Sequence, residues 1–145
     1  MTEVVFHVNV ADKLFFSCRL VRKTYVHGAN IVVTAEPALL AQLDAMLRTF
    51  SPVDFVPHCK VSAVETTAAE SPVLLAEALG DCKGHNILIN LGQGIPLGFE
   101  RFARFIEVAS DTKEDLVAAR LRWRHYADRG YALTRHDHAA AGERA

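Results

Sequence analysis

The residues best suited to chemistry lie near the C-terminus, around the chain's single tryptophan. Four apolar residues recur at helical spacing and share one sector of a predicted helix: Leu116, Ala119, Trp123 and Tyr126. Arg120 and Arg124 flank this sector beside Trp123, while three further basic residues fall on the opposite side of the helix: Arg122, His125 and Arg129. The spacing thus places a large flat apolar ring between two guanidinium groups.

This combination fits more than one function. Arginine binds carboxylates through two parallel hydrogen bonds, and Trp and Arg are enriched at binding hot spots, so an acidic peptide with apolar residues is one ligand. Single-stranded nucleic acid, held by stacking and phosphate contacts, is another. A third interpretation is that Trp123 simply belongs to the core. The pattern alone leaves all three open.

The distribution of charge points to the same region. Residues 1–100 hold seven Lys or Arg against ten Asp or Glu, whereas residues 101–145 hold nine against seven, and eight of those nine are arginine. The C-terminal region therefore suits a local site for an acidic partner, or a solvated helix face. The formal net charge of -1 argues against a protein that coats nucleic acid.

Nucleotide and metal chemistry have weak signals. Gly92-Gln93-Gly94 follows a predicted strand, but Pro96 comes next and no P-loop lysine follows. Cys82 and His85 have C-x-x-H spacing without the second pair that structural zinc needs. No catalytic constellation emerges, so we expect no enzyme activity, no cofactor and no metal. The alternative is a small nucleotide-binding α/β enzyme.

Alternating strands and helices must position these residues. Hydrophobic runs and helical periodicity predict strands over 4–10, 29–34, 86–91 and 105–109, and helices over about 13–27, 37–49 and 112–129. The last helix opens with a capping box from Asp111 and Glu114. We expect residues 55–58 to be an edge or loop, 62–72 a surface loop, 72–76 a strand or helical turn, and 131–134 an edge strand.

This order predicts one α/β domain with a largely parallel central sheet and helices on both faces, Rossmann-like but without a nucleotide site. We expect the domain over residues 1–134 and a flexible tail over 135–145. No apolar run is long enough to span a membrane. Three widely spaced cysteines and the absence of a signal peptide favour a cytoplasmic protein.

Several segments, in this order and spacing, resemble the chi subunit family of bacterial DNA polymerase III holoenzyme. They are Lys13-Leu14 through Arg22-Lys23, Leu43-Asp44, Phe50-Ser51-Pro52, Phe55-Val56-Pro57-His58, Ile89-Asn90-Leu91-Gly92, and Arg120-x-x-Trp123-Arg124-x-Tyr126-x-x-x-Gly130-Tyr131. The resemblance runs from the first strand to about residue 134. It implies a non-catalytic adaptor with an α/β fold reminiscent of nucleotide-binding domains.

The resemblance also implies two protein partners, with nucleic acid reached only indirectly. One is the acidic C-terminal tail of single-stranded DNA-binding protein, which Arg120, Trp123 and Arg124 would bind, with Leu116 and Ala109 walling the pocket. The other is the psi subunit, which tethers the family to the clamp loader. Its contact would involve Arg48, Phe50, Phe55, Val56, Pro57 and His58.

Two positions depart from some relatives. Arg48 stands where some relatives carry an aromatic residue, and this affects the predicted psi contact. Trp123 stands where tyrosine is also found, and this substitution preserves the flat apolar surface.

Overall fold

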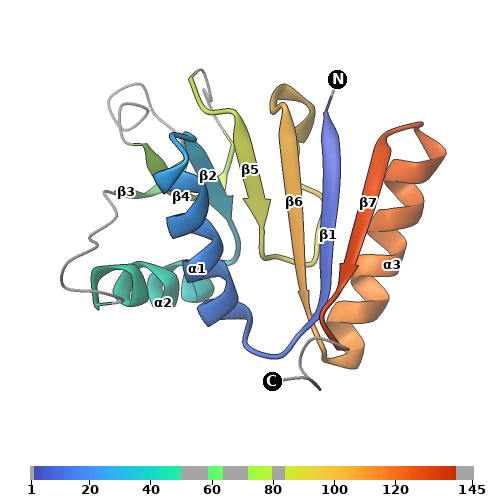
Figure 1. Ribbon diagram of the computed structural model, residues 1–145, viewed down its shortest axis with the longest axis horizontal. Coiled ribbons are helices and arrows are strands. Elements are labelled where there is room, and N and C mark those ends of the chain that lie inside the picture. The colour runs from blue at the N-terminus through green and yellow to red at the C-terminus, as the bar shows by residue number, and fades with distance from the viewer. Residues whose placement is uncertain (1, 50–58, 64–71, 80–83, 140–145) are drawn as a thin grey trace.

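A single sheet of seven strands organises the computed structural model, which describes residues 2–49, 59–63, 72–79 and 84–139. The strand order is β3-β4-β2-β5-β6-β1-β7 (Figure 1). The strands are β1 (Glu3–Val10), β2 (Ile31–Thr34), β3 (Cys59–Ala63), β4 (Val73–Ala78), β5 (Ile87–Asn90), β6 (Arg104–Ser110) and β7 (Ala132–Asp137). Every pairing between them is parallel.

Helices cover both faces of this sheet. On one face, α1 (Lys13–Val26) and α2 (Pro37–Thr49) pack over a cluster that includes Val5, Ile31 and Leu75. On the other, α3 (Lys113–Asp128) and the short 3-10 helix η2 (Phe99–Arg101) pack over a second cluster that includes Phe6 and Tyr126. The predicted α/β architecture is confirmed. None of the helices in the described ranges is long and apolar enough to cross a membrane.

Helices α1 and α2 form where their sequence patterns predict, and α1 shows why. At its start, the Asp12 side chain caps α1 by accepting a hydrogen bond from the Phe15 backbone N–H at 3.0 Å. At its end, Gly28 follows the helix with φ of 85°. On the inner side of α1, Cys18 is fully buried, and burial raises the pKa of its thiol to about 11. This thiol packs in the core, as buried cysteines commonly do.

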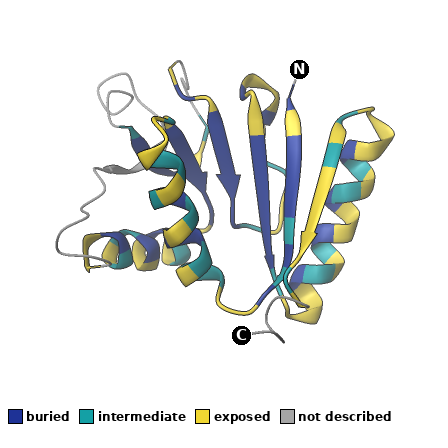
Figure 2. Ribbon diagram, in the orientation of Figure 1, coloured by how far each residue is buried: buried dark blue, intermediate teal, exposed yellow. Residues whose placement is uncertain are grey.

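The last strand is longer than the sequence indicates. We expected an edge strand over 131–134 and a tail from 135, but β7 continues to Asp137, and the His138 backbone N–H donates to the Val8 carbonyl at 2.9 Å. β7 lies beside β1 at the margin of the sheet and is exposed over most of its length (Figure 2). Residues 135–139 therefore pack against the domain.

Two local predictions need correction, and one open alternative is decided. Residues 59–63 form strand β3, so the predicted loop over 62–72 begins too early. Of the two alternatives left open for residues 72–76, the strand is confirmed, since Val73–Ala78 form β4. Thr112, and not Asp111, caps α3, because its Oγ1 accepts from the Asp115 backbone N–H at 3.3 Å. Residues 55–58 lie outside the described ranges.

Candidate functional site: a groove between α3 and the sheet margin

A groove of about 380 Å³ lies between α3 and two neighbouring strands, β1 and the edge strand β7. Its walls combine apolar, basic and polar side chains from all three elements: Phe6, Val8, Asn9, Leu116, Ala119, Arg120, Trp123, Arg124, Arg135 and Asp137. The α3 part of this list contains the residues that helical spacing brings together around the tryptophan. We call it the α3 groove.

A buried ion pair sets the rotation of α3 on the sheet. Arg122 Nε lies 3.0 Å from Glu107 Oε2, and the same oxygen accepts a hydrogen bond from the Tyr126 hydroxyl at 2.6 Å. Asn90 Nδ2 donates to Glu107 Oε1 at 2.8 Å, and Arg122 also donates to the Gln93 carbonyl. Burial raises the pKa of Glu107 above its ordinary value, although Arg122 and these hydrogen bonds oppose the change.

This pair corrects one sequence prediction. Arg122 was expected on the side of the helix opposite Trp123, with the other outward-facing basic residues, yet its side chain is only 3% exposed. The inner stripe of α3 is Asp115, Ala119, Arg122 and Tyr126. The side of α3 that faces the sheet therefore includes Arg122, which the apolar sector predicted from the sequence did not. Leu116 and Trp123 of that sector lie at the boundary between the core and the groove.

Trp123 belongs to both regions. Its indole contacts Phe6 of β1 edge-on, with ring centroids 5.2 Å apart, and packs against the cluster beneath α3. The ring is nevertheless half-buried and lines the groove. Packing on Phe6 holds the indole in one orientation, so a ligand would meet a preformed apolar surface.

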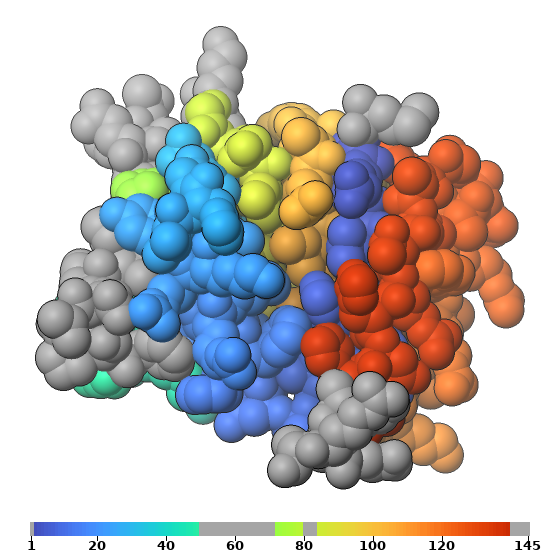
Figure 3. All heavy atoms as spheres, in the orientation of Figure 1, coloured from blue at the N-terminus to red at the C-terminus, as the bar shows by residue number. Residues whose placement is uncertain are grey.

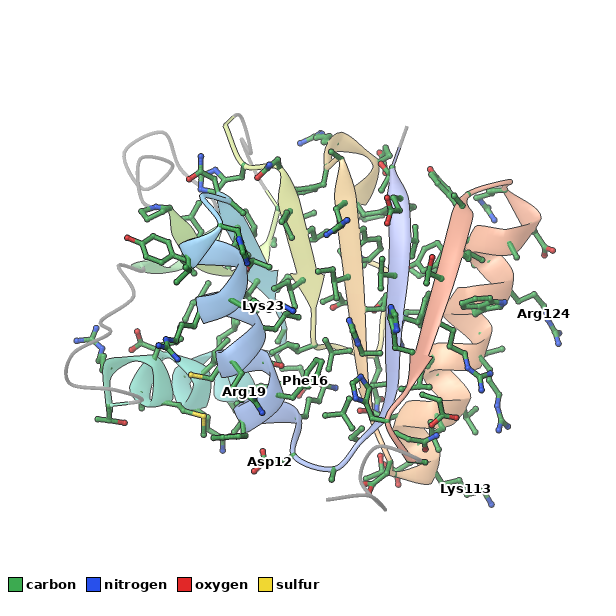
Figure 4. All side chains as sticks on the ribbon, viewed as in Figure 1. Asp12, Phe16, Arg19, Lys23, Lys113 and Arg124 are labelled. Carbon is green, nitrogen blue, oxygen red and sulfur yellow. The ribbon has the colours of Figure 1, made fainter. Side chains whose placement is uncertain are left out.

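Three arginines surround this surface. Arg120 and Arg124 are exposed on α3, and Arg124 extends away from the helix (Figure 4). The third is Arg135 of β7, whose Nη2 lies 3.3 Å from Asp137 Oδ2. Sequence reasoning missed Arg135 because it placed residue 135 in a tail. The i,i+2 spacing of Arg135 and Asp137 was the available signal, since alternate strand residues share one side.

The groove also holds one carboxylate with several donors. Asn9, the one non-glycine residue with positive φ (58°) in the described chain, donates from Nδ2 to Asp137 Oδ1 at 2.9 Å. The hydrogen bonds from Asn9 and the Ala139 backbone N–H, with Arg135 nearby, lower the pKa of Asp137. Asp137 thus remains ionised at neutral pH and ties β7 to the irregular end of β1.

Comparison with known families accounts for the whole domain. The family model described as DNA polymerase III chi subunit, HolC, matches residues 1–134. The chain belongs to this chi family. DNA polymerase III subunit chi of Pseudomonas aeruginosa is 32% identical over 143 residues, covering 94% of this chain and 96% of that protein.

A more distant likeness concerns the fold of this chi-family chain alone. The C-terminal domain of S. cerevisiae Dbp5 superposes with a TM-score of 0.64 at 10% identity, covering 99% of this chain and 94% of that one. This neighbour supports the Rossmann-like architecture predicted from the order of strands and helices.

The other residues predicted to bind partners are distributed unevenly. Ala109 is buried in β6, 1% exposed, and does not line the α3 groove. Arg48 is exposed at the end of α2, where its Nε lies 3.4 Å from Asp44 Oδ2. The remaining predicted psi contacts, Phe50, Phe55, Val56, Pro57 and His58, lie outside the described residues.

The places where a nucleotide phosphate would bind are already used by the protein. The Asp12 carboxylate caps the start of α1, and a second negative charge there would be repelled. In the loop after β5, the Gly92 N–H donates to Asn90 Oδ1, while Gly94 and Gln93 carbonyls accept from Asn90 and Arg122. These contacts make the loop a support for the buried ion pair.

Proposed function

We propose that this chi-family chain is a non-catalytic accessory subunit of the DNA replicase that binds the acidic C-terminal tail of single-stranded DNA-binding protein. The observation that supports the proposal is the α3 groove, where three arginines from two elements surround an indole held by Phe6. Carboxylates of the tail would pair with the guanidinium groups, and its apolar end would pack on Trp123.

The groove favours a short peptide over a folded partner. At about 380 Å³ it accommodates only a few side chains. Its arginines are exposed, so each ion pair with the peptide contributes little and is screened by salt. We therefore expect a dissociation constant on the order of micromolar.

We also propose that the psi subunit joins this protein to the clamp loader through a second surface. In support, Arg48 lies exposed at the C-terminal end of α2, two positions before Phe50 in the sequence, and α2 is on the sheet face opposite α3. Two partners on opposite faces could bind at the same time. An adaptor requires this separation.

Fluorescence polarisation with a labelled peptide tests the first interaction. The peptide should carry several aspartates followed by an apolar pair, and should bind saturably at low salt and more weakly as salt rises. Arg124→Ala and Trp123→Ala should each weaken binding by at least about tenfold. Arg129→Ala is the matched control, since this exposed arginine of the same region does not line the groove.

A peptide with asparagine in place of each aspartate separates charge from shape. It should bind much more weakly if the arginines recognise carboxylates. Equal binding of the two peptides, or wild-type affinity of the Trp123→Ala variant, would contradict the proposed site.

A further inference from the structure

A second groove lies on the opposite face of the sheet, between α1 and the strands β1 and β7. It consists of two hollows of about 640 and 510 Å³ that share His7, Leu20, Lys23 and His27. Atoms of β6 and β1 are visible between α1 and β7, so no helix covers this part of the sheet (Figure 3). We call it the α1 groove.

One wall of the α1 groove is basic. Arg19 and Lys23 lie one helical turn apart on α1, about 6 Å along the axis. Neither forms an ion pair with any residue that the structure describes. Among the described residues, Glu3 is the carboxylate that lines the groove. Its Oε1 lies 3.8 Å from Nη2 of Arg104, another lining residue. An anion could therefore pair with both cations without displacing a carboxylate, and the Arg19 guanidinium also lies 5.8 Å from the centre of the Phe15 ring.

The other wall is a layer of flat rings. The His7 imidazole of β1 stacks on His136 of β7, with centroids 5.0 Å apart and planes inclined by 17°. The Phe16 ring lies 5.0 Å from His7 and 4.9 Å from His138. Phe16 extends from α1 toward the strands, as does Lys23 (Figure 4). Rings from three segments thus form one surface beside the cations.

The imidazoles serve as stacking groups and not as a metal centre. His7 Nδ1 and His138 Nε2 share a hydrogen bond of 2.9 Å, which occupies one ring nitrogen of each. In the described part of the chain, no group of three His, Cys, Asp or Glu side chains is arranged to hold a metal ion. Burial, reinforced by His138, His136 and Lys23, lowers the pKa of His7 to about 4, so this ring is neutral at neutral pH.

We propose that the α1 groove binds single-stranded nucleic acid directly, with phosphates on Arg19 and Lys23 and bases against Phe16 and the imidazoles. A basic wall facing a layer of rings is the arrangement by which proteins hold single strands without reading sequence. An acidic peptide fits less well, because the cations are spread along the helix and do not surround an apolar pocket. The contact is separate from the α3 groove and departs from the expectation that this protein reaches nucleic acid only indirectly.

The predicted interaction is weak and salt-dependent. Two phosphate contacts to a single strand give a slope of about −1.4 in a plot of log affinity against log salt concentration, at about −0.7 per phosphate. Stacking of bases on the rings adds affinity that depends little on the base sequence. Replacing one stacking ring should weaken binding by roughly fivefold or more.

Fluorescence anisotropy with a labelled oligothymidine at low salt tests the proposal on the full chain. Saturable binding is expected, and the double variant Arg19→Ala/Lys23→Ala should lose at least about tenfold in affinity. The matched control is Arg129→Ala, an exposed arginine far from this groove, which should bind as the wild type does. Failure of the oligothymidine to bind overturns the proposal, and so does binding that survives the double substitution.

A ring substitution and a competitor complete the test. Phe16→Leu keeps an apolar group against the core and should weaken oligothymidine binding, with thermal unfolding used to confirm that the variant is folded. An aspartate-rich peptide should not displace the oligothymidine. Displacement by the peptide, together with direct binding of a labelled peptide that the Arg19→Ala/Lys23→Ala variant weakens, would instead identify an acidic peptide as the occupant and overturn the proposal.

Discussion

Arg122 of α3 and Glu107 of β6 form an ion pair of 3.0 Å, and their side chains are 3% and 0% exposed. Asn90 and the Tyr126 hydroxyl donate further hydrogen bonds to Glu107, and the Gln93 carbonyl accepts one from Arg122. It connects the loop after β5, the centre of the sheet and α3. The α3 groove depends on it, because the pair determines which side of the helix faces outward.

Removing one member of this pair should destabilise the fold strongly. Glu107→Leu leaves the guanidinium of Arg122 buried without a counter-ion, and the free energy of unfolding should fall by about 3–5 kcal/mol. Urea denaturation measures this change. The double variant Glu107→Leu/Arg122→Met removes both charges and should recover much of the loss. A single variant as stable as the wild type would contradict the role of the pair.

Neutralising Asp137 should strengthen binding of an acidic peptide. Asp137 is the carboxylate of the α3 groove and lies beside Arg135, so Asp137→Asn removes a repulsive charge and releases that arginine. The amide oxygen still accepts from Asn9. We expect affinity to rise about threefold to tenfold at low salt, as for other exposed charges.

The same polarisation titration checks this effect against Asp128→Asn, which changes net charge equally at an exposed α3 position outside the groove. The control should alter affinity only slightly. An Asp137→Asn variant that binds the acidic peptide more weakly than the wild type would contradict the predicted repulsion.

His7 should make stability fall in mild acid. Its pKa is lowered to about 4 in the folded protein, while the unfolded chain protonates near pH 6.5, so the unfolded state binds more protons between these values. The contribution of His7 is fully present above pH 6.5 and is lost as the pH falls toward 4. Because solvent partly screens this half-buried ring, the free energy of unfolding should fall by only about 1–2 kcal/mol over this pH range.

Denaturant unfolding at a series of pH values tests this, with His7→Gln as the variant and His27→Gln as an exposed control. Stability should depend less on pH over this window in His7→Gln than in the wild type. A His7→Gln profile parallel to that of the wild type would exclude His7 as the source.

Asp115 should contribute stability at neutral pH that weakens in strong acid. Burial raises the pKa of its carboxyl, but donation from the Ser110 backbone N–H, Lys13, Gln93 and the Ser110 hydroxyl lowers it below the ordinary value overall. The stabilisation is therefore present above the unfolded pKa of about 3.8 and is lost as the pH falls below it.

Asp115→Asn should lower the free energy of unfolding at pH 7 by about 2–3 kcal/mol, because charge-assisted hydrogen bonds are replaced. The deficit should shrink at low pH. Asp111→Asn, at an exposed neighbouring position, is the control for the change in helix charge. A deficit that stays constant down to strong acid would contradict the assignment.

Local spacing alone determined much of this protein. The helix around Trp123, the capping of α1 by Asp12 and the parallel, two-sided sheet all follow from periodicity, cap residues and buried strand runs. These features depend on residues close in sequence, so one chain segment carries enough information to predict them. The flanking of Trp123 by Arg120 and Arg124 is predictable for the same reason.

Contacts between distant segments decided the rest. Arg122 looks like an outward-facing residue until Glu107 of another element provides a buried counter-charge. Arg135 and Asp137 enter the α3 groove because β7 pairs with β1, which also brings His136 and His138 to His7 on the other face. Burial of the Arg122 charge depends on a partner in another element, fifteen residues away, and the joining of β1 to β7 into a site depends on partners more than one hundred residues away. No local pattern encodes them.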